Sequence, residues 1–280
     1  MDTRATVWGI VGALSLYGCS PGDDVFDEEL EFRSSDAGAG GGGRDSWAPP
    51  GRPGGGDDDD GGGGWIINGL HAPDVSGINP WHPLSSTLGM SETNGLLCTD
   101  QGKGLAEYIV ECALGPDQSV TKNVGGQTHV IHGEIGLAPQ WENGSCDDTC
   151  QKWISACLLA RTNVSEQNVD LWLQADHPAI GYGLPAGVTM TLEGAFYGNL
   201  FWTGSFLYYC EGAQSGNIAA TRDGRTCSTG GCGFSNFGSC TQVAGRCTMG
   251  GPNGDVPINC REGKPYYDPQ WPTIATYLPE

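Results

Sequence analysis

Residues 147–161 read DDTCQKWISACLLAR, and this stretch decides the class of fold that the rest of the chain must match. Its apolar residues recur at spacings of three and four, the pattern of an amphipathic helix with one buried face. They are Cys150, Trp153, Ile154, Cys157 and Leu158. Asp148 precedes Gln151 by three residues, which predicts a capping pair at the start of the helix. Asn163 follows the run, and we expect the helix to end there.

A second helix is expected over Gly104–Leu114, where apolar residues again recur every three or four positions. The residues of its buried face are Leu105, Tyr108, Ile109 and Cys112. Short strands are expected in the rest of the domain. A turn at Asn123–Gly126 predicts a hairpin between Ser119–Lys122 and Thr128–Ile135. Further short strands are expected at Val169–Leu173, Val188–Leu192, Phe196–Trp202 and Ser205–Cys210.

The chain after Cys210 is rich in glycine and cysteine and shows little periodicity. We expect this C-terminal part to be irregular and held by disulfides. With two helices and several short antiparallel strands before it, residues 65–280 are predicted to form one α+β domain. A domain of this length can bury a substantial core.

Eleven cysteines lie in residues 65–280, without a Cys-x-x-Cys pair or a Cys-His dipeptide. This spacing favours a disulfide framework over a metal or redox site, and we expect neither a metal nor a cofactor. Cys112 and Cys157 lie on the apolar faces of the two helices and are expected to pair. A local bridge between Cys146 and Cys150 would leave Cys98 as the candidate for an unpaired thiol. The other disulfide candidates, whose connectivity the sequence leaves open, are Cys210, Cys227, Cys232, Cys240, Cys247 and Cys260.

The amino terminus carries Arg4 and then an uncharged, largely apolar run from Ala5 to Gly18, which is too short to cross a bilayer. The run ends in Leu16-Tyr17-Gly18-Cys19, which resembles the lipobox of bacterial lipoprotein signal peptides. The resemblance implies that residues 1–18 are removed and that the Cys19 sulfur and the new amino group are acylated. Ser20 then favours the outer membrane. The alternative is an ordinary signal peptide cleaved nearby, with Cys19 a plain thiol.

Residues 19–64 are dominated by Gly, Asp and Pro, and residues 20–64 hold 12 acidic and 3 basic side chains. Such a segment buries too little apolar surface to fold, so we expect a disordered tether behind the lipidated cysteine. The short segment Val25–Phe32 could dock on a partner. The whole chain has a net charge of -20 and a pI near 4.3, which excludes a phosphate-binding face and makes nucleic acid an improbable partner.

Residues 65–280 contain no Gly-x-Ser-x-Gly elbow, no Walker A loop and no His-Glu-x-x-His motif. His129 and His132 lie three apart on an expected strand and therefore point to opposite faces, which argues against a shared metal. Carboxylates are the remaining route to catalysis, because glycosidases need two of them around the bond that is cut. The candidates beside ordered segments are Glu111, Glu134, Asp170 and Glu193. Arg161 and Asn163, at the end of the helix, could cap carbonyls or bind an anion, and capping is the commoner use.

Aromatic side chains concentrate between Trp141 and Tyr209. On the expected strand Phe196–Trp202, alternate rings must face opposite sides. Two interpretations stay open: one side exposes rings that stack on sugars, or both sides are buried.

Four segments resemble a group of secreted or lipid-anchored proteins of myxobacteria and their relatives. They are Tyr108–Leu114, Gly136–Trp141, Trp153–Asn163 and Glu193–Asn199. The resemblance implies an exported, disulfide-linked domain behind a variable spacer, and it implies no activity or catalytic residue.

These observations favour a protein anchored by lipid to the cell envelope, on the outer membrane. Its expected role is binding, adhesion or envelope structure, with a polysaccharide or an envelope protein as partner. The alternative is a surface-tethered hydrolase that acts on polysaccharide or peptide polymers. A third hypothesis, a subunit of an envelope assembly, would use Val25–Phe32 for docking.

Overall fold

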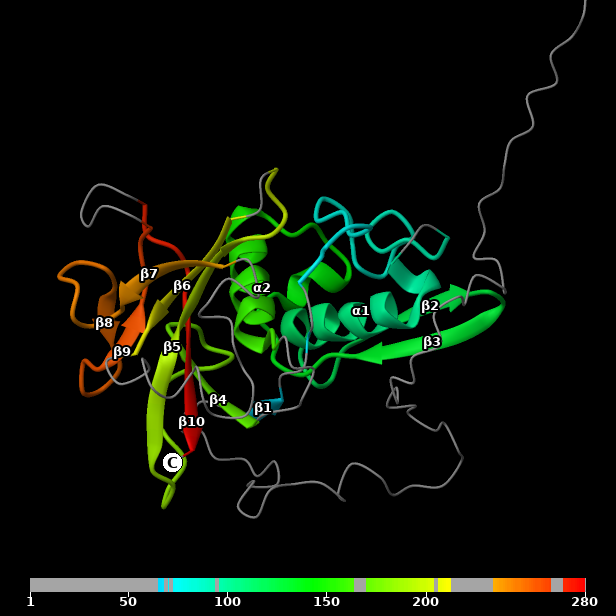
Figure 1. Cartoon of the computed structure of the whole chain (residues 1–280). Coiled ribbons are helices and arrows are strands. Elements are labelled where there is room, and N and C mark those ends of the chain that lie inside the picture. Colours follow the sequence, from blue (N-terminus) through cyan, green and yellow to red (C-terminus); the bar gives the residue numbers. More distant parts are fainter. Residues whose placement is uncertain are drawn as a thin grey trace, which may run out of the picture.

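A six-stranded sheet forms the centre of the computed structural model, which describes residues 65–67, 70, 73–93, 96–163, 170–203, 206–212, 234–262 and 269–279 (Figure 1). The strand order is β1-β4-β10-β5-β6-β7. Neighbouring strands are antiparallel except β6 and β7, which are parallel. The bounds are β1 Trp65–Ile67, β4 Asp170–Ala175, β5 Met190–Asn199, β6 Phe206–Glu211, β7 Ser235–Ser239 and β10 Ile274–Pro279.

Two α-helices lie on one side of this sheet (Figure 1). Helix α2 (Asp148–Arg161) packs on β5 and β10, and α1 (Asp100–Ala113) packs on α2 as an outer layer. The hairpin of β2 (Ser119–Val124) and β3 (Gln127–His132) lies beside α1. No helix in the described ranges has the length and the apolar run that a bilayer crossing requires. The predicted α+β class, with two helices and several antiparallel strands, is confirmed.

Both helices begin at a side-chain cap. Thr99 precedes α1 and accepts a hydrogen bond from the Gly102 amide at 3.1 Å. Asp147 precedes α2 and accepts one from the Cys150 amide at 2.9 Å. The predicted capping residue, Asp148, was therefore wrong by one position. Asp148 lies inside the first turn and pairs instead with Lys152, at 2.6 Å.

Short 3-10 helices connect these elements. Helix η2 (Leu96–Cys98) leads into α1, and η3 (Pro139–Glu142) lies between β3 and α2. Gly102 lets η2 approach α1 closely, because a Cβ atom at this position would lie 1.7 Å from the Leu96 carbonyl oxygen. The first turn of α1 can therefore accept only glycine there.

Each face of the sheet carries its own core, because successive side chains on a strand point to opposite sides. The helix-side core lies between the sheet and the two helices and includes Phe196, Tyr209, Leu173 and Ile274. The disulfide-side core lies on the opposite face, under a hairpin of β8 (Thr248–Gly250) and β9 (Val256–Ile258). Its members include Trp172, Tyr197, Tyr208, Trp271 and Tyr277.

The C-terminal part is more ordered than expected. Strands β7 to β10 all follow Cys210, where an irregular segment was predicted. Strand β10 pairs with β4 on one side and β5 on the other, so it occupies a central position in the sheet. The prediction failed because β10 is buried on both faces, and its residues therefore show no alternation of polar and apolar types.

Four disulfides join cysteines within the described residues. They are Cys112–Cys157, Cys146–Cys150, Cys210–Cys240 and Cys247–Cys260. The expected bridge between the two helices is thus present. Cys98 is disulfide-bonded as well, so the expectation of a free thiol there was wrong. The expectation came from an odd count of eleven in residues 65–280, which sets Cys19 aside; the full chain has twelve cysteines. Cys19, Cys227 and Cys232 lie outside the described residues, as does the predicted tether.

Candidate functional site

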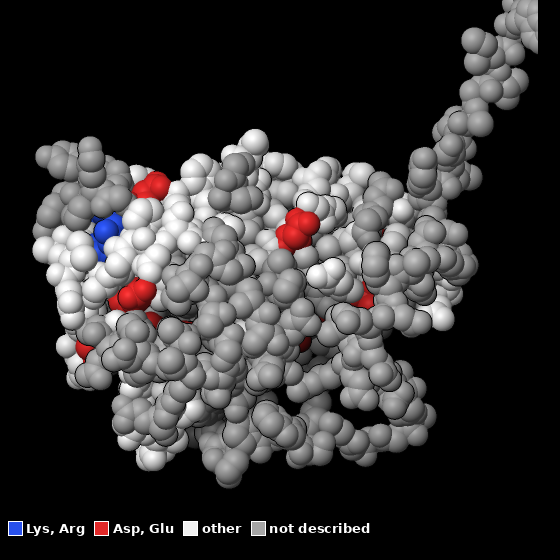
Figure 2. Space-filling model, viewed as in Figure 1, with Lys and Arg blue, Asp and Glu red and all other residues white. Residues whose placement is uncertain are grey.

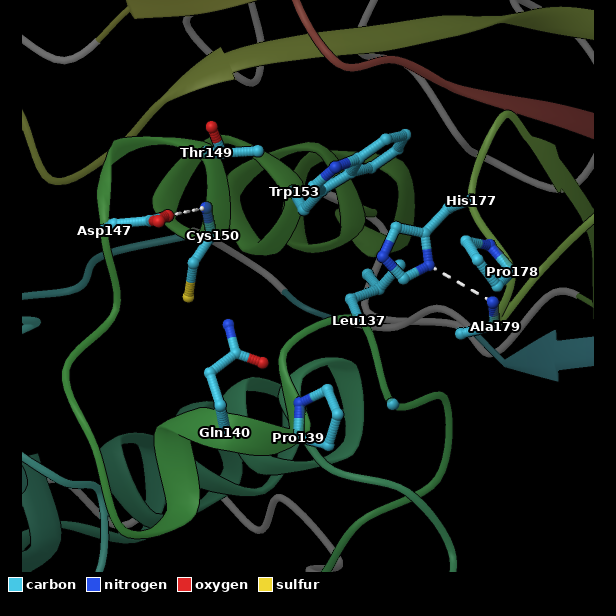
Figure 3. Close-up of a pocket in the computed structure, with 11 residues that line it drawn as sticks. Leu137, Pro139, Gln140, Asp147, Thr149, Cys150, Trp153, His177, Pro178 and Ala179 are labelled. Carbon is cyan, nitrogen blue, oxygen red and sulfur yellow. Dashed lines mark hydrogen bonds between the residues drawn. The ribbon is translucent and has the colours of Figure 1, made fainter.

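A pocket of about 600 Å³ opens at the N-terminal end of α2 (Figure 3). Three segments that are far apart in the sequence form its walls: residues 136–140, the first turns of α2, and the turn at residues 177–179. Small-molecule sites in proteins commonly have a volume of this order.

The backbone fixes the wall formed by residues 136–140. The Leu137 amide donates to the Cys112 carbonyl at 3.0 Å, and the Ala138 amide donates to the Ala113 carbonyl at 2.8 Å. These bonds use carbonyl groups that the end of α1 would otherwise leave without partners. The opposite wall begins at Asp147, the cap of α2, and includes Cys150. The disulfide between Cys150 and Cys146 links the first turn of α2 to the segment that precedes the helix. Both walls are therefore held in place before any ligand arrives.

Two ring systems meet at the back of the pocket. Trp153, one turn into α2, and His177, just after β4, lie with their ring centroids 4.9 Å apart in an edge contact (Figure 3). His177 Nδ1 accepts a hydrogen bond from the Ala179 amide at 3.2 Å. Burial lowers the pKa of His177, and a hydrogen bond with the Leu137 backbone partly opposes this shift. The imidazole is therefore neutral at pH 7 and orients the Trp153 ring and the turn.

The polar groups on the rim suit hydrogen bonding better than acid–base catalysis. Gln140 and Thr149 are exposed, and the Gln140 side chain points toward Cys150 (Figure 3). Asp147 is the one carboxylate among the lining residues, and it already accepts the Cys150 amide. Cys150 is in a disulfide and supplies no thiolate. The pocket therefore offers an aromatic ring, an amide and a hydroxyl, without the pair of carboxylates that glycoside hydrolysis requires.

Two of the predicted carboxylates come together elsewhere, around Arg161. Its Nη2 lies 2.6 Å from Glu111 Oε2 and 4.0 Å from Glu134 Oε2, and its guanidinium stacks on Tyr108 at 4.2 Å. The Arg161 side chain is buried, whereas both glutamates are about one-third exposed. The guanidinium pairs with Glu111 and offsets part of the charge of Glu134, and so it joins α1 to α2 and to the segment after β3. The printed distances thus make this cluster an ion-pair network around the Arg161 guanidinium.

The other predicted site residues are separated from the pocket. Glu193 is buried in the sheet and accepts a hydrogen bond from the Thr276 hydroxyl at 2.6 Å. Asp170 begins β4, and its side chain lies outside the described part of the chain. Asn163 pairs through its backbone with Leu70. His129 is half-buried and His132 exposed on β3, in keeping with their expected surface position.

A buried lysine forms hydrogen bonds with the long loop between β1 and α1. Lys122, on β2, is fully buried, and its Nζ donates to the Ser86 carbonyl at 2.6 Å and to the Met90 carbonyl at 3.0 Å. Burial lowers the pKa of Lys122 to about 8, and the nearby charge of Glu92 partly opposes this. An ammonium group at this position therefore stabilises the loop at a cost in desolvation.

The aromatic residues of β5 and β6 are mainly buried on both faces. Phe196 and Tyr209 belong to the helix-side core, and Tyr197 and Tyr208 to the disulfide-side core. Trp202, beyond the end of β5, is 40% exposed. The interpretation with both faces buried therefore holds for the strand itself.

Charge is sparse on the face shown in Figure 2. The described surface there is largely uncharged, with separate acidic patches and a small basic patch near the C-terminal strands. A face of this kind suits a neutral ligand better than a polyanion.

Sequence reasoning missed most of the pocket. Gln140, Thr149 and His177 belong to no recognisable motif, and Trp153 appeared only as one member of an apolar helix face. Comparison of the chain with protein-family models, with curated proteins and with solved structures finds no match.

Proposed function

We propose that this chain is a lipid-anchored protein of the cell envelope whose folded part binds a neutral saccharide in the pocket at the start of α2. The observation that carries the proposal is the composition of that pocket. The half-buried Trp153 ring lies beside an apolar wall and an exposed amide and hydroxyl, with a single carboxylate that is already used. Sugar rings bind such sites because their C–H faces stack on aromatic rings while their hydroxyls need polar partners.

Two further features support the proposal. Four disulfides in the described residues are typical of proteins that work in an oxidising compartment, which fits export behind a lipoprotein signal peptide. The acidic balance of the chain, a net charge of -20, repels acidic polymers and favours uncharged ones. The resemblance of the lipobox implies that Cys19 carries the anchor.

The ligand test uses the full chain and a set of soluble neutral polysaccharides, with depletion of the protein and release of reducing ends as the two readouts. We expect depletion without new reducing ends. Trp153→Ala should weaken retention by about tenfold or more, since removing a central aromatic contact commonly costs over 1 kcal/mol. Gln140→Ala tests the polar rim with an exposed residue whose loss leaves the core intact.

The matched control is Trp81→Ala, which removes an exposed tryptophan outside the pocket. Equal loss of retention in the Trp81 and Trp153 variants would overturn the assignment of this pocket. New reducing ends would replace binding by hydrolysis, the alternative function.

The anchor is tested separately by the intact mass of protein extracted from membranes. A chain that begins at Cys19 and carries acyl groups is the expected result, because the lipobox resemblance places cleavage before this residue. An unmodified amino terminus at or near that position would contradict the anchor while leaving the saccharide pocket untouched.

A further inference from the structure

The sulfur atoms of two neighbouring disulfides meet inside the disulfide-side core. Cys210 Sγ lies 3.6 Å from Cys247 Sγ and 4.0 Å from Cys260 Sγ. The three sulfur atoms all lie within 4.8 Å of one another. Cys240 is bonded to Cys210, so its sulfur adjoins the same group. All four residues are buried.

These separations are close to those of a metal tetrathiolate. Zinc binds thiolate sulfur at about 2.3 Å, and four ligands at the corners of a tetrahedron then lie about 3.8 Å apart. Cys210 Sγ already has about this spacing from both sulfurs of the second bridge. On reduction the bonded pairs would separate, and Cys240 Sγ, as the fourth ligand, would turn toward the other three. We propose that reduction of the two bridges turns Cys210, Cys240, Cys247 and Cys260 into a closed site for one zinc ion. The site goes beyond the proposed function and uses none of the saccharide pocket.

Backbone hydrogen bonds position the four cysteines in addition to their bridges. Cys210 lies within β6, and the amide of Cys240 donates to the Glu211 carbonyl at 2.8 Å. Cys247 and Cys260 flank the β8–β9 hairpin, whose strands pair along their length. The Cys260 amide donates to the Thr273 hydroxyl at 2.9 Å. A scaffold of this kind presents the ligands to a metal at low entropic cost.

Two arginines flank the cluster in an otherwise acidic protein. Arg246 precedes Cys247 and Arg261 follows Cys260. The two are joined by hydrogen bonds, from Arg246 Nη1 to the Arg261 carbonyl at 3.0 Å and from the Arg261 amide to the Arg246 carbonyl at 2.8 Å. Neighbouring cations favour the thiolate form of cysteine. They also offset the two negative charges that remain when four thiolates bind one Zn²⁺ ion.

The redox step needs a dithiol as reductant. Two dithiol molecules give up four electrons and four protons and become two disulfides, while the two protein bridges become four thiols. Zinc then binds the sulfurs as the four thiol protons leave to the solvent. Oxidation by the reverse route would release the metal.

The test uses the full chain, reduced with a dithiol and freed of reductant under nitrogen. Cobalt(II) serves as the spectroscopic probe. We expect one ion per chain and the intense absorption of tetrahedral cobalt–thiolate bonds. Zinc should then displace the cobalt. A reduced chain that takes up no cobalt overturns the proposal.

Variants and labelling locate the ion. Cys210→Ser/Cys247→Ser should abolish the spectrum, whereas Cys146→Ser/Cys150→Ser, the matched control, should leave it unchanged. In the unaltered chain, one equivalent of zinc should slow alkylation of the four cluster cysteines by about tenfold or more, since thiolates bound to structural zinc are held tightly. Cys146 should stay reactive. Protection of Cys146, or a spectrum that survives the first variant, would place the metal elsewhere and overturn the proposal.

Discussion

On one face of the sheet, two regular helices form the cover, and a single disulfide joins them. On the other face, short strands and loops form the cover, and two disulfides meet within the layer. The helix side is filled mainly by aliphatic residues and alanines, while the disulfide side is rich in tyrosine and tryptophan. The same sheet thus supports one layer that regular helices define and another that depends more on covalent links.

This difference shows that the chain forms its two cores from different kinds of secondary structure. A helix presents a continuous apolar stripe and so buries much surface per residue. Short strands connected by turns bury less and cannot order themselves as well, and disulfides reduce the entropy that they would lose on folding. We expect the two faces to respond differently to loss of a side chain and to reduction.

The largest effect is expected from Phe196→Ala, on the helix side. The ring is 1% exposed and stacks on Tyr209 with centroids 5.3 Å apart, so its loss leaves a cavity in a layer of packed side chains. Unfolding in urea should show a loss of about 3–5 kcal/mol. The neighbouring variant on the other face, Tyr197→Phe, removes only the hydrogen bond from its hydroxyl to the Arg261 carbonyl and should cost about 1 kcal/mol. Equal losses would contradict the comparison.

Next in size is the loss of single bridges. Cys112→Ala/Cys157→Ala opens a link across 45 residues and should cost about 4 kcal/mol in the chain-entropy model. Cys146→Ala/Cys150→Ala opens one across 4 residues and should cost about 2 kcal/mol. The free energy of unfolding of both variants, measured in urea without reductant, gives the difference. If loss of the short bridge lowers the free energy of unfolding as much as loss of the long one, the bridges act through local packing and not through chain entropy.

A smaller effect is expected from Lys122, which supports the helix side without a covalent bond. Its pKa is lowered from 10.5 to about 8 in the folded state, so the unfolded chain binds more protons between these values. Stability should therefore rise with pH above about 8, by at most about 1.4 kcal/mol per pH unit. Lys122→Met should remove this rise.

The pH range for this measurement is 8 to 9.5, set by the tyrosines. Burial raises the pKa of Tyr197 and of Tyr277, so their effect on stability begins only as the unfolded tyrosines ionise near pH 10. An unchanged slope in Lys122→Met would assign the pH dependence to another group.

The smallest effect is expected at the pocket at the start of α2. The pKa of His177 is lowered from 6.5, so the unfolded chain binds the proton first as the pH falls. The free energy of unfolding should therefore be highest well above pH 6.5 and decline as the pH falls below it. His177→Asn keeps an acceptor at the Nδ1 position for the Ala179 amide and should remove the decline. A decline of the same size in the variant would assign it to carboxylates.

The sequence allowed the helix side to be predicted more fully than the disulfide side. The spacing of apolar residues in 147–161 was sufficient to place α2, and the cysteine on each helix face indicated the bridge between Cys112 and Cys157. The start of α1 was missed by four residues, because Gly102 and Gly104 lower helix propensity while the Thr99 cap extends the helix.

Strands were harder to predict for a physical reason. A break was expected around Gly194, yet β5 runs through it. The glycine makes room for its neighbours, because a Cβ atom at this position would lie 2.8 Å from the Tyr209 ring. The pocket could not be predicted either, because its walls come from 136–140, the start of α2 and 177–179. Only the fold brings these segments together.

The position of β10 has a consequence for how the protein is made. Residues 274–279 pair with both β4 and β5, and they follow all the other strands of this sheet in the sequence. Until they emerge, β4 and β5 have no neighbour between them, and the sheet cannot close. Pairing across so many residues is slow, since distant segments must find each other before any bond compensates the lost entropy. A growing chain therefore keeps this part of the sheet open until residues 274–279 have been made.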